Sequence, residues 1–337
     1  MADADGTDRD PAAEDASFSW QVIRSLLYSG LGKTVSKVLN VVALLVVLKL
    51  ISTSAFGIAS IVLAIFSILR AVTELGLGVA IVQAQDITRE EIDSLFWLSL
   101  AVSGSLYLLL VAASPLISWF YGEPQLTELL QVYGLAVVVF SFYFVPKNLL
   151  TKEMAFGRIV FAENASLLAS SVVMVALAYY GYGAWSIILG ELGNRVGRLV
   201  LFQLFRPHWP HWTFNWTKVW PRVSFGLYAT GSRLLYNFYI NADYLLVGRL
   251  FGPEAVGIYT MAYRIISDPV RTLASTINDV AYPAFSKLQN ELSRLRTYFF
   301  TIARANLSLI GLVLVIIGVH IEELLVVGGY EKYFDAI

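Results

Sequence analysis

Charged side chains at helical spacing interrupt stretches of this sequence that are otherwise apolar. Arg70 and Glu74 lie four residues apart, directly after the 20 uncharged residues 50–69, and residues four apart share one face of a helix. A charge at the centre of a membrane helix costs about 2.5–3.5 kcal/mol on insertion scales and therefore marks a functional or water-filled interior. A self-neutralised structural bridge between Arg70 and Glu74 is the alternative, and the pair alone does not decide between the two.

Three other segments carry a similar polar stripe on an apolar helix. The stripes consist of Lys33, Lys37 and Asn40; of Arg233, Asn237 and Asn241, with Asp243 nearby; and of Arg264, Asp268, Arg271, Ser275 and Asn278. Because lipid does not tolerate such a stripe, each one must face protein or water. We therefore predict that the four segments share one cavity.

The sign of the charge in this predicted cavity indicates its ligand. Six cations stand against three carboxylates in the four stripes, and surplus positive charge in a low-dielectric surround attracts anions. Arginine also suits fork-like contact with phosphate. The predicted substrate-binding residues are Lys33, Lys37, Arg70, Arg233, Asn237, Asn241, Arg264 and Arg271. The candidates for coupling to a proton or sodium ion are Glu74, Asp243 and Asp268, although Asp243 is equally well interpreted as a fixed partner of Arg233 or Arg249.

Other kinds of chemistry find little support in the sequence. The chain has no cysteine, and its net charge of −1 gives no sign of a nucleic-acid partner. His208 and His211 are separated by Trp209 and Pro210, and the proline spoils helical ligand spacing. No carboxylate or third histidine is near them in sequence. We predict no catalytic residue, no metal site and no cofactor, and therefore no enzyme.

The elements that must position the stripes are transmembrane helices. Hydrophobic residues make up 57% of the 337 residues and charged residues 15%, against about 25% charged in a soluble domain. Because about 20 apolar residues span a bilayer, we predict an all-α, polytopic transmembrane helical bundle of about nine spans. The predicted spans are 29–50, 56–82, 94–118, 126–147, 159–180, 184–204, 221–247, 255–285 and 298–320.

The loops between these spans predict their orientation. With a cytoplasmic N-terminus, the inner segments hold twelve Lys and Arg residues and the outer loops three, as the positive-inside rule requires. We predict a multi-pass protein of the cytoplasmic membrane, with residues 1–20 as a disordered acidic cytoplasmic tail.

Residues 206–220 form a predicted tryptophan-rich linker at the cytoplasmic interface. Trp212, Trp216 and Trp220 lie four apart, which predicts that they share one face of a helix. An interfacial anchor is the favoured interpretation, and a carbohydrate-stacking surface is the alternative. In the span before the linker, Glu191, Arg195 and Arg198 lie along one face near the cytoplasmic half. We interpret them as snorkelling toward the inner surface and leave them out of the site.

A weak internal repeat links the two halves. Residues 49–58 read KLISTSAFGI and residues 249–258 read RLFGPEAVGI, with four identities in ten. An even number of spans separates the copies, so they predict parallel six-helix repeats with a site at their interface. The predicted lobes are residues 21–205 and 221–337, and the second is incomplete.

At this point the sequence resembles the Wzx-type polysaccharide transporters, flippases of the multidrug/oligosaccharidyl-lipid/polysaccharide exporter superfamily. The motifs that carry the resemblance are ELGLGVAIVQ at 74–83, VPKNLL at 145–150, GYGAW at 181–185, NADYLLVGR at 241–249, GIYTMAYR at 257–264 and YPAFSKLQ at 282–289. The resemblance implies a two-lobed transporter that moves a polyprenyl-diphosphate-linked oligosaccharide to the outer leaflet by alternating access. Members of that family have twelve to fourteen spans, so we expect this chain to be a C-terminally truncated piece.

Three other functions stay open. A membrane-embedded glycosyltransferase would also meet lipid-linked sugars, but the predicted first external loop, residues 49–56, has no acidic residue to bind a metal and activate an acceptor. A small-molecule exporter of the same superfamily fits the topology, although its cavity is expected to be acidic or apolar. A non-transporting membrane component of a glycan assembly complex also fits, and truncation makes it less remote. The expected partners are the lipid bilayer, a lipid-linked oligosaccharide and other glycan-assembly membrane proteins.

Overall fold

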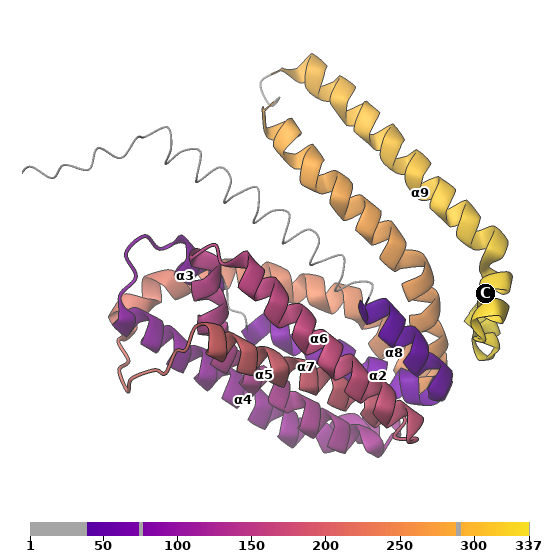
Figure 1. The fold of residues 1–337 in the computed structure, drawn as a ribbon, viewed down its shortest axis with the longest axis horizontal. Helices are drawn as coiled ribbons and strands as arrows, with labels where there is room; N and C mark the ends of the chain where they lie inside the picture. The colour runs from indigo at the N-terminus through magenta and orange to yellow at the C-terminus, as the bar shows by residue number, and fades with distance from the viewer. Residues whose placement is uncertain (1–38, 74–76, 288–290, 337) are drawn as a thin grey trace, which may run out of the picture. The chain divides into compact units, whose positions relative to one another are not determined.

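The computed structural model describes residues 39–73, 77–287 and 291–336 (Figure 1). All the regular elements in these ranges are helices, and several are long and apolar enough to cross a bilayer. The predicted fold class, an all-α polytopic membrane protein, is confirmed. Lys33, Lys37 and Glu74 lie outside the described residues.

The helices follow the predicted spans closely. They are Leu39–Leu50, α2 (Thr53–Thr73), α3 (Leu77–Gln83), α4 (Arg89–Tyr121), α5 (Gln125–Lys152), α6 (Phe156–Tyr179), α7 (Ala184–Phe205), α8 (Trp216–Lys287), α9 (Leu292–Gly328) and the short 3₁₀ helix η1 (Glu331–Ala336). Within the described ranges, α2, α4, α5, α6 and α9 have the length and hydropathy of membrane spans. Helix α7 carries three charges near its middle. The 72 residues of α8 form two helices joined at a kink at Gly252, whose backbone is not helical (φ 84°, ψ 175°). The count of nine spans therefore stays a prediction.

The chain divides into two compact units. The first contains residues 62–243 and the helix Leu39–Leu50, and the second contains residues 51–61 and 244–337. This division differs from the predicted lobes because it assigns the linker and the first part of α8 to the first unit.

Helix pairs build the first unit. Helix α4 packs on α5, α6 packs on α7, and α5 also packs on α7. A seam of fully buried serines joins α4 to α5: Ser99 donates to Ser141 over 3.2 Å, and Ser141 donates to Ser103 over 2.9 Å. Small hydroxyl side chains let membrane helices approach closely and bond across the interface.

The ends of α4 are fixed by local sequence. Thr88 caps its N-terminus in a capping box with Glu91, and Gly122 ends it in the left-handed conformation with φ 71°. Each device satisfies backbone groups that the helix itself leaves unpaired. The helix therefore begins at Arg89, five residues before the predicted start at position 94.

Two glycines bring helices together in the second unit. A Cβ atom on Gly57 would lie 1.7 Å from the carbonyl oxygen of Pro253, and one on Gly257 would lie 2.2 Å from that of Thr53. The contact is reciprocal, because Thr53 and Pro253 occupy matching places in the predicted repeat, as do the two glycines. A two-fold relation produces reciprocal contacts of this kind, and the repeat itself stays a prediction.

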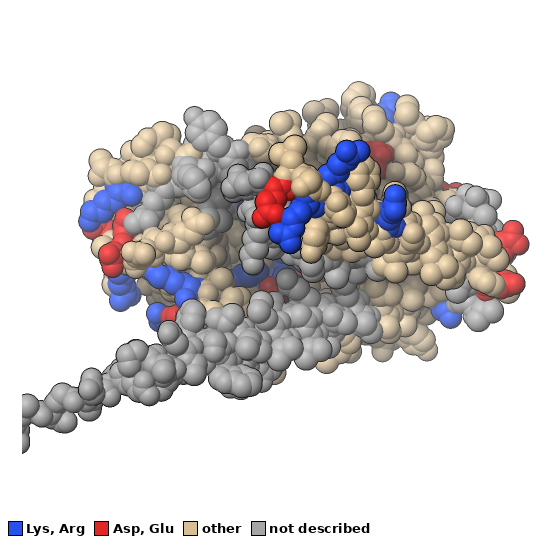
Figure 2. All heavy atoms as spheres, turned by 90° about the horizontal axis from the view of Figure 1, so that it is seen from above, with Lys and Arg blue, Asp and Glu red and all other residues tan. Residues whose placement is uncertain are grey.

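The surface agrees with a membrane environment. Figure 2 shows broad uncharged areas on one face, with basic and acidic side chains lying next to one another in a few clusters. Within α9, no residue of the most apolar stretch is buried, and Leu307 and Val319 are exposed. Exposed apolar helix faces of this kind suit contact with lipid or with other membrane helices.

Candidate functional site

Arg195 lies at the middle of α7 and faces the inside of the first unit. Its guanidinium carbon is 5.5 Å from the ring centre of Phe66 in α2. Its Nη1 atom donates to the hydroxyl of Tyr143 in α5 over 3.5 Å, a long contact. Its Nε atom is buried and has no hydrogen-bond partner among the described residues. The side chain therefore keeps donor capacity inside the helix bundle.

Tyr133 of α5 lies at the centre of this group. Its side chain is fully buried, and its ring centre is 4.4 Å from that of Phe66. Arg70, Glu191 and Arg195 all lie close enough to Tyr133 to act on it electrostatically. Arg70 of α2 is exposed, so its predicted role in the site stays a prediction.

A polar ladder in α8 meets the same part of α2. Ser67 donates to Oδ1 of Asn237 over 3.1 Å, and Nδ2 of Asn241 lies 3.3 Å from the Ser67 hydroxyl. Nδ2 of Asn237 also donates to the carbonyl oxygen of Arg233. The predicted spacing of Arg233, Asn237 and Asn241 therefore forms a continuous stripe, and α2 connects it to the Arg195 group.

We call Phe66, Ser67, Arg70, Tyr133, Tyr143, Arg195, Asn237 and Asn241 the polar centre of the first unit. Helix α2 organises it because Phe66, Ser67 and Arg70 fall within two turns of one helix. The residues offer guanidinium, amide and hydroxyl groups. Tyr133 and Tyr143 are buried, the side chains of Ser67, Arg195, Asn237 and Asn241 are partly buried, and Arg70 is exposed. A low-dielectric surround strengthens the hydrogen bonds such groups make and raises the cost of leaving them unmade.

The two arginines predicted on α8 stack on aromatic rings of the second unit. Arg264 lies 5.8 Å from the ring centre of Phe56. Arg271 lies 5.0 Å from that of Tyr263 and donates to the Tyr263 hydroxyl. Cation–π contacts of this kind hold a guanidinium without neutralising it.

The predicted carboxylates are less completely described. Asp243 lies half-buried in α8, while the side chain of Asp268 and the whole of Glu74 fall outside the described residues. A single site shared by all four predicted stripes therefore stays a prediction.

Sequence reasoning missed Arg195. The interpretation as a snorkelling side chain was wrong, because the guanidinium turns inward to Phe66 and Tyr143 rather than toward the cytoplasmic surface. Two signals in the sequence could have found it. Arg195 stands in the middle of its span, and Glu191 lies one turn earlier on the same face.

A second polar cluster joins the linker to α4. Nε2 of His208 lies 3.1 Å from Oδ1 of Asp93, and Nδ1 of His211 lies 3.5 Å from Oδ2. Burial lowers the pKa of His208, and the Asp93 carboxylate opposes this shift. Among the residues that the structure describes, no group of three such side chains has the geometry of a metal site.

The tryptophans of the linker do not share one helix face. Helix α8 begins at Trp216, so Trp212 lies in the preceding loop, where it stacks on Trp97 with ring centres 4.4 Å apart. Trp216 and Trp220 do lie one turn apart in α8, with ring centres 5.2 Å apart. The expectation of three tryptophans on one face was therefore wrong for Trp212.

Comparison with known proteins decides the family. The profile of the family described as "Polysaccharide biosynthesis protein" matches residues 46–328, most of the chain. The chain belongs to this family. The resemblance to Wzx-type transporters is thereby confirmed, and the family is one of membrane transport proteins rather than enzymes.

Curated relatives of the family give a consistent picture. The chain is 27% identical to the lipopolysaccharide biosynthesis protein WzxC of Escherichia coli (strain K12), with 87% of this chain and 58% of that protein covered. It is 26% identical to the teichuronic acid biosynthesis protein TuaB of Bacillus subtilis (strain 168), with 79% and 56% covered. It is also 26% identical to the succinoglycan biosynthesis transport protein ExoT of Rhizobium meliloti (strain 1021), with 81% and 55% covered.

The alignments cover most of this chain but a smaller share of each relative. The chain spans little more than half the length of each of them. No solved structure gives a significant match.

Proposed function

We propose that the chain binds a polyprenyl-diphosphate-linked oligosaccharide and takes part in moving it across the cytoplasmic membrane. The observation that carries the proposal is the buried guanidinium of Arg195, whose Nε atom has no partner among the described residues. Arg70 lies on α2, one turn after Phe66, the ring on which Arg195 lies. The printed names of the relatives, which concern polysaccharide biosynthesis and transport, support a saccharide cargo.

The polar centre suits the two parts of such a ligand. Guanidinium groups bind phosphate oxygens through paired, charge-assisted hydrogen bonds. The amides of Asn237 and Asn241 suit sugar hydroxyls, which both donate and accept. The polyprenyl tail stays in the bilayer, where burying an apolar chain costs nothing.

Transport requires more than the polar centre. We propose that Lys33, Lys37, Arg233, Arg264 and Arg271 complete a cationic cavity between two lobes that open in turn to each side. Coupling to a proton or sodium ion at Glu74, Asp243 or Asp268 belongs to this proposal. The proposal also includes a cytoplasmic N-terminus and an association with other glycan-assembly membrane proteins.

Binding is the step that this chain can test by itself. The experiment measures the affinity of the purified chain in lipid nanodiscs for a fluorescent polyprenyl-diphosphate oligosaccharide. Arg195→Met keeps the apolar stem and removes the charge. We expect affinity to fall at least about tenfold, since a hydrogen bond to a charged group contributes about 1.5–3 kcal/mol. Arg70→Met should act in the same direction.

The control lies one turn further along the same helix. Nε of Arg198 donates to Oδ1 of Asn194 over 3.2 Å. Arg198→Met removes the same charge and changes the side-chain volume by the same amount as Arg195→Met. Thermal unfolding is followed in parallel, because removing one member of a buried charged group can destabilise the fold, and only variants that unfold like the unmodified chain report on binding. If Arg195→Met and Arg70→Met bind like the unmodified chain, or if Arg198→Met weakens binding equally, the proposal fails.

A further inference from the structure

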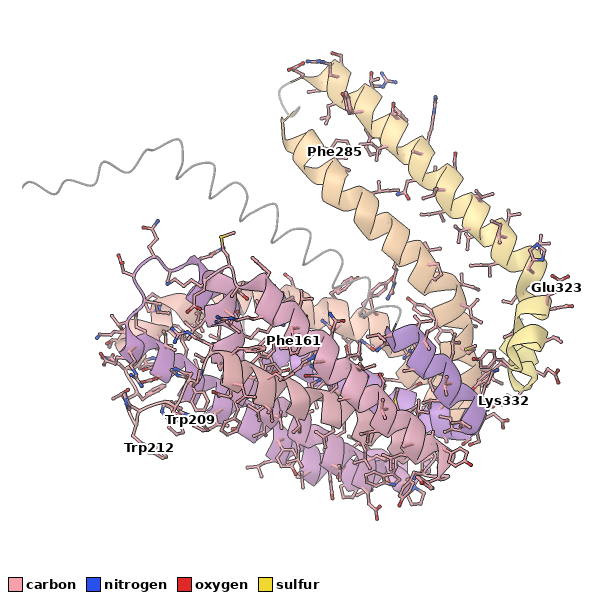
Figure 3. All side chains as sticks on the ribbon, in the orientation of Figure 1. Phe161, Trp209, Trp212, Phe285, Glu323 and Lys332 are labelled. Carbon is pink, nitrogen blue, oxygen red and sulfur yellow. The ribbon has the colours of Figure 1, made fainter. Side chains whose placement is uncertain are left out.

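Five aromatic side chains lie exposed in and just after the linker between α7 and α8. They are Trp209, Trp212, Phe214, Trp216 and Trp220. Trp212 is 89% exposed and Trp209 is 71% exposed, and Figure 3 shows both at the margin of the first unit. Large aromatic groups exposed together in this way mark a surface that is covered in the working protein.

The linker that carries these rings is held in place by the first turns of α4. The backbone N–H of His211 donates to Asp93 over 3.3 Å, and that of Asn215 donates to the Ser94 hydroxyl over 3.0 Å. In the other direction, the indole N–H of Trp97 donates to the carbonyl oxygen of His211 over 2.8 Å. The aromatic rings are therefore displayed by a fixed backbone.

Asp93 is the point to which the linker is tied. Its side chain is 1% exposed and lies within 3.5 Å of both linker imidazoles, those of His208 and His211. A buried carboxylate is costly unless neighbouring groups compensate it. Oδ2 of Asp93 accepts from the His211 backbone N–H, whereas its Oδ1 lies 3.1 Å from Nε2 of His208 without a hydrogen bond among the described residues. Because these neighbours are linker groups, Asp93 and the linker backbone hold each other in position.

The charges beside the rings are already paired with one another. Lys218 pairs with Glu90, and Arg206 pairs with Glu153 over 2.8 Å. The side-chain amide of Asn215 donates to Glu90 over 3.0 Å. A sugar-binding surface needs free polar groups next to its rings, whereas a lipid interface needs apolar rings with a wet edge. This arrangement favours lipid.

We propose that this aromatic surface docks into the boundary between lipid headgroups and acyl chains, with Asp93 as the residue that positions it. The place of the linker in the chain agrees, because α7 ends at Phe205 and α8 begins only at Trp216. A connection of ten residues between two helices of a membrane bundle lies where those helices leave the bilayer. Tryptophan is enriched at this depth in membrane proteins.

The absence of cysteine from the chain makes the depth measurable. The experiment places a spin label at Thr213→Cys, next to Trp212, in vesicles of phosphatidylethanolamine and phosphatidylglycerol. Collision with oxygen, which concentrates in lipid, is compared with collision with a polar nickel complex. Two references set the scale: Leu109→Cys on an exposed side of α4 for the bilayer, and Asp86→Cys in an exposed loop for water.

We expect the oxygen-to-nickel ratio at position 213 to be severalfold above that at position 86 and below that at position 109. A ratio equal to that of position 86 overturns the proposal. Protection of a water-exposed label by an added soluble oligosaccharide also overturns it and identifies a carbohydrate surface instead.

A second variant tests the role of Asp93 separately. Asp93→Asn keeps the shape of the side chain but removes the charge that faces both imidazoles. We expect the label at position 213 to become more mobile and its oxygen-to-nickel ratio to fall, while the label at position 109 does not change. Asp86→Asn, the same change at an exposed acid, should leave both labels unaffected. Unchanged mobility at position 213 in Asp93→Asn refutes the positioning role. A rise in mobility at both labels, 213 and 109, indicates global unfolding instead.

Discussion

Arg195 and His208 are two ionisable side chains placed in opposite settings. Arg195 cannot lose its proton under any ordinary condition, so its burial leaves a permanent charge that needs a partner. His208 can lose its proton, and burial lowers its pKa because a buried site disfavours the charged imidazolium. The first is suited to hold an anion, and the second makes the linker sensitive to acid.

The stability of the linker should therefore depend on pH. Burial lowers the pKa of His208, and the charges of Arg89, Arg206 and His211 act in the same direction against that of Asp93. The unfolded chain thus binds a proton more readily than the folded one. Stability from neutral His208 is complete above its ordinary pKa of about 6.5 and is lost as the pH falls below it.

The label at Thr213→Cys reports this loss. We expect its mobility to rise when the pH is lowered from 7.5 to about 5, since this range spans the ordinary histidine pKa. His208→Asn cannot take up a proton and should remove most of the rise. His320→Asn, which changes a histidine of α9, should preserve it. A rise that survives in His208→Asn assigns the effect to another group.

At the scale of elements, the reciprocal glycine contact should limit what α2 and α8 tolerate. Gly57→Ala brings a methyl group onto the Pro253 carbonyl, 1.7 Å from the oxygen. Backbone must move to relieve this clash, and overpacking typically costs about 1–3 kcal/mol. We expect a lower unfolding temperature in detergent for Gly57→Ala and for Gly257→Ala.

Gly104 in α4 provides the matched control. A Cβ atom there meets nothing within 4 Å, and alanine is favoured over glycine in a helix interior by about 0.5–1 kcal/mol. Gly104→Ala should therefore keep or raise the unfolding temperature. Equal losses at positions 57 and 104 contradict a specific contact at Gly57.

The existence of the helices could be predicted from sequence because long uncharged runs have few other structures open to them in a membrane. The residues at which the helices begin and end were harder to predict. Hydropathy placed the start of α4 at position 94, since Arg89 and Glu90 look like loop residues. The capping box of Thr88 and Glu91 was visible in the sequence and indicates the true start.

The candidate site was predictable only in part, for a physical reason. Helical spacing correctly placed Arg233, Asn237 and Asn241 on one stripe, because neighbours on a helix face are fixed by its geometry. Which helix faces which is decided by packing between distant segments. The sequence could mark Arg195 as a candidate residue. It could not show that Arg195 lies beside Phe66, or that Asp93 lies beside His208 and His211.

At the scale of the whole chain, the helix ends carry a second sign of internal repetition. Helices α4 and α9 both end in a left-handed glycine with φ 71°, Gly122 and Gly329. A new helix begins within three residues of each, at Gln125 and at Glu331. Together with the reciprocal glycines, this supports parallel repeats, in which matching loops open on the same side of the membrane.

That arrangement fixes the expected side of every loop. Cysteine substitutions at two exposed loop positions test it, Thr213 in the linker and Tyr182 between α6 and α7. With a cytoplasmic N-terminus, a membrane-impermeant maleimide added to intact cells should modify Tyr182→Cys and spare Thr213→Cys. Permeabilised cells should show both modified, which controls for reactivity. Modification of Thr213→Cys from outside reverses the orientation, and modification of both in intact cells removes one span from between them.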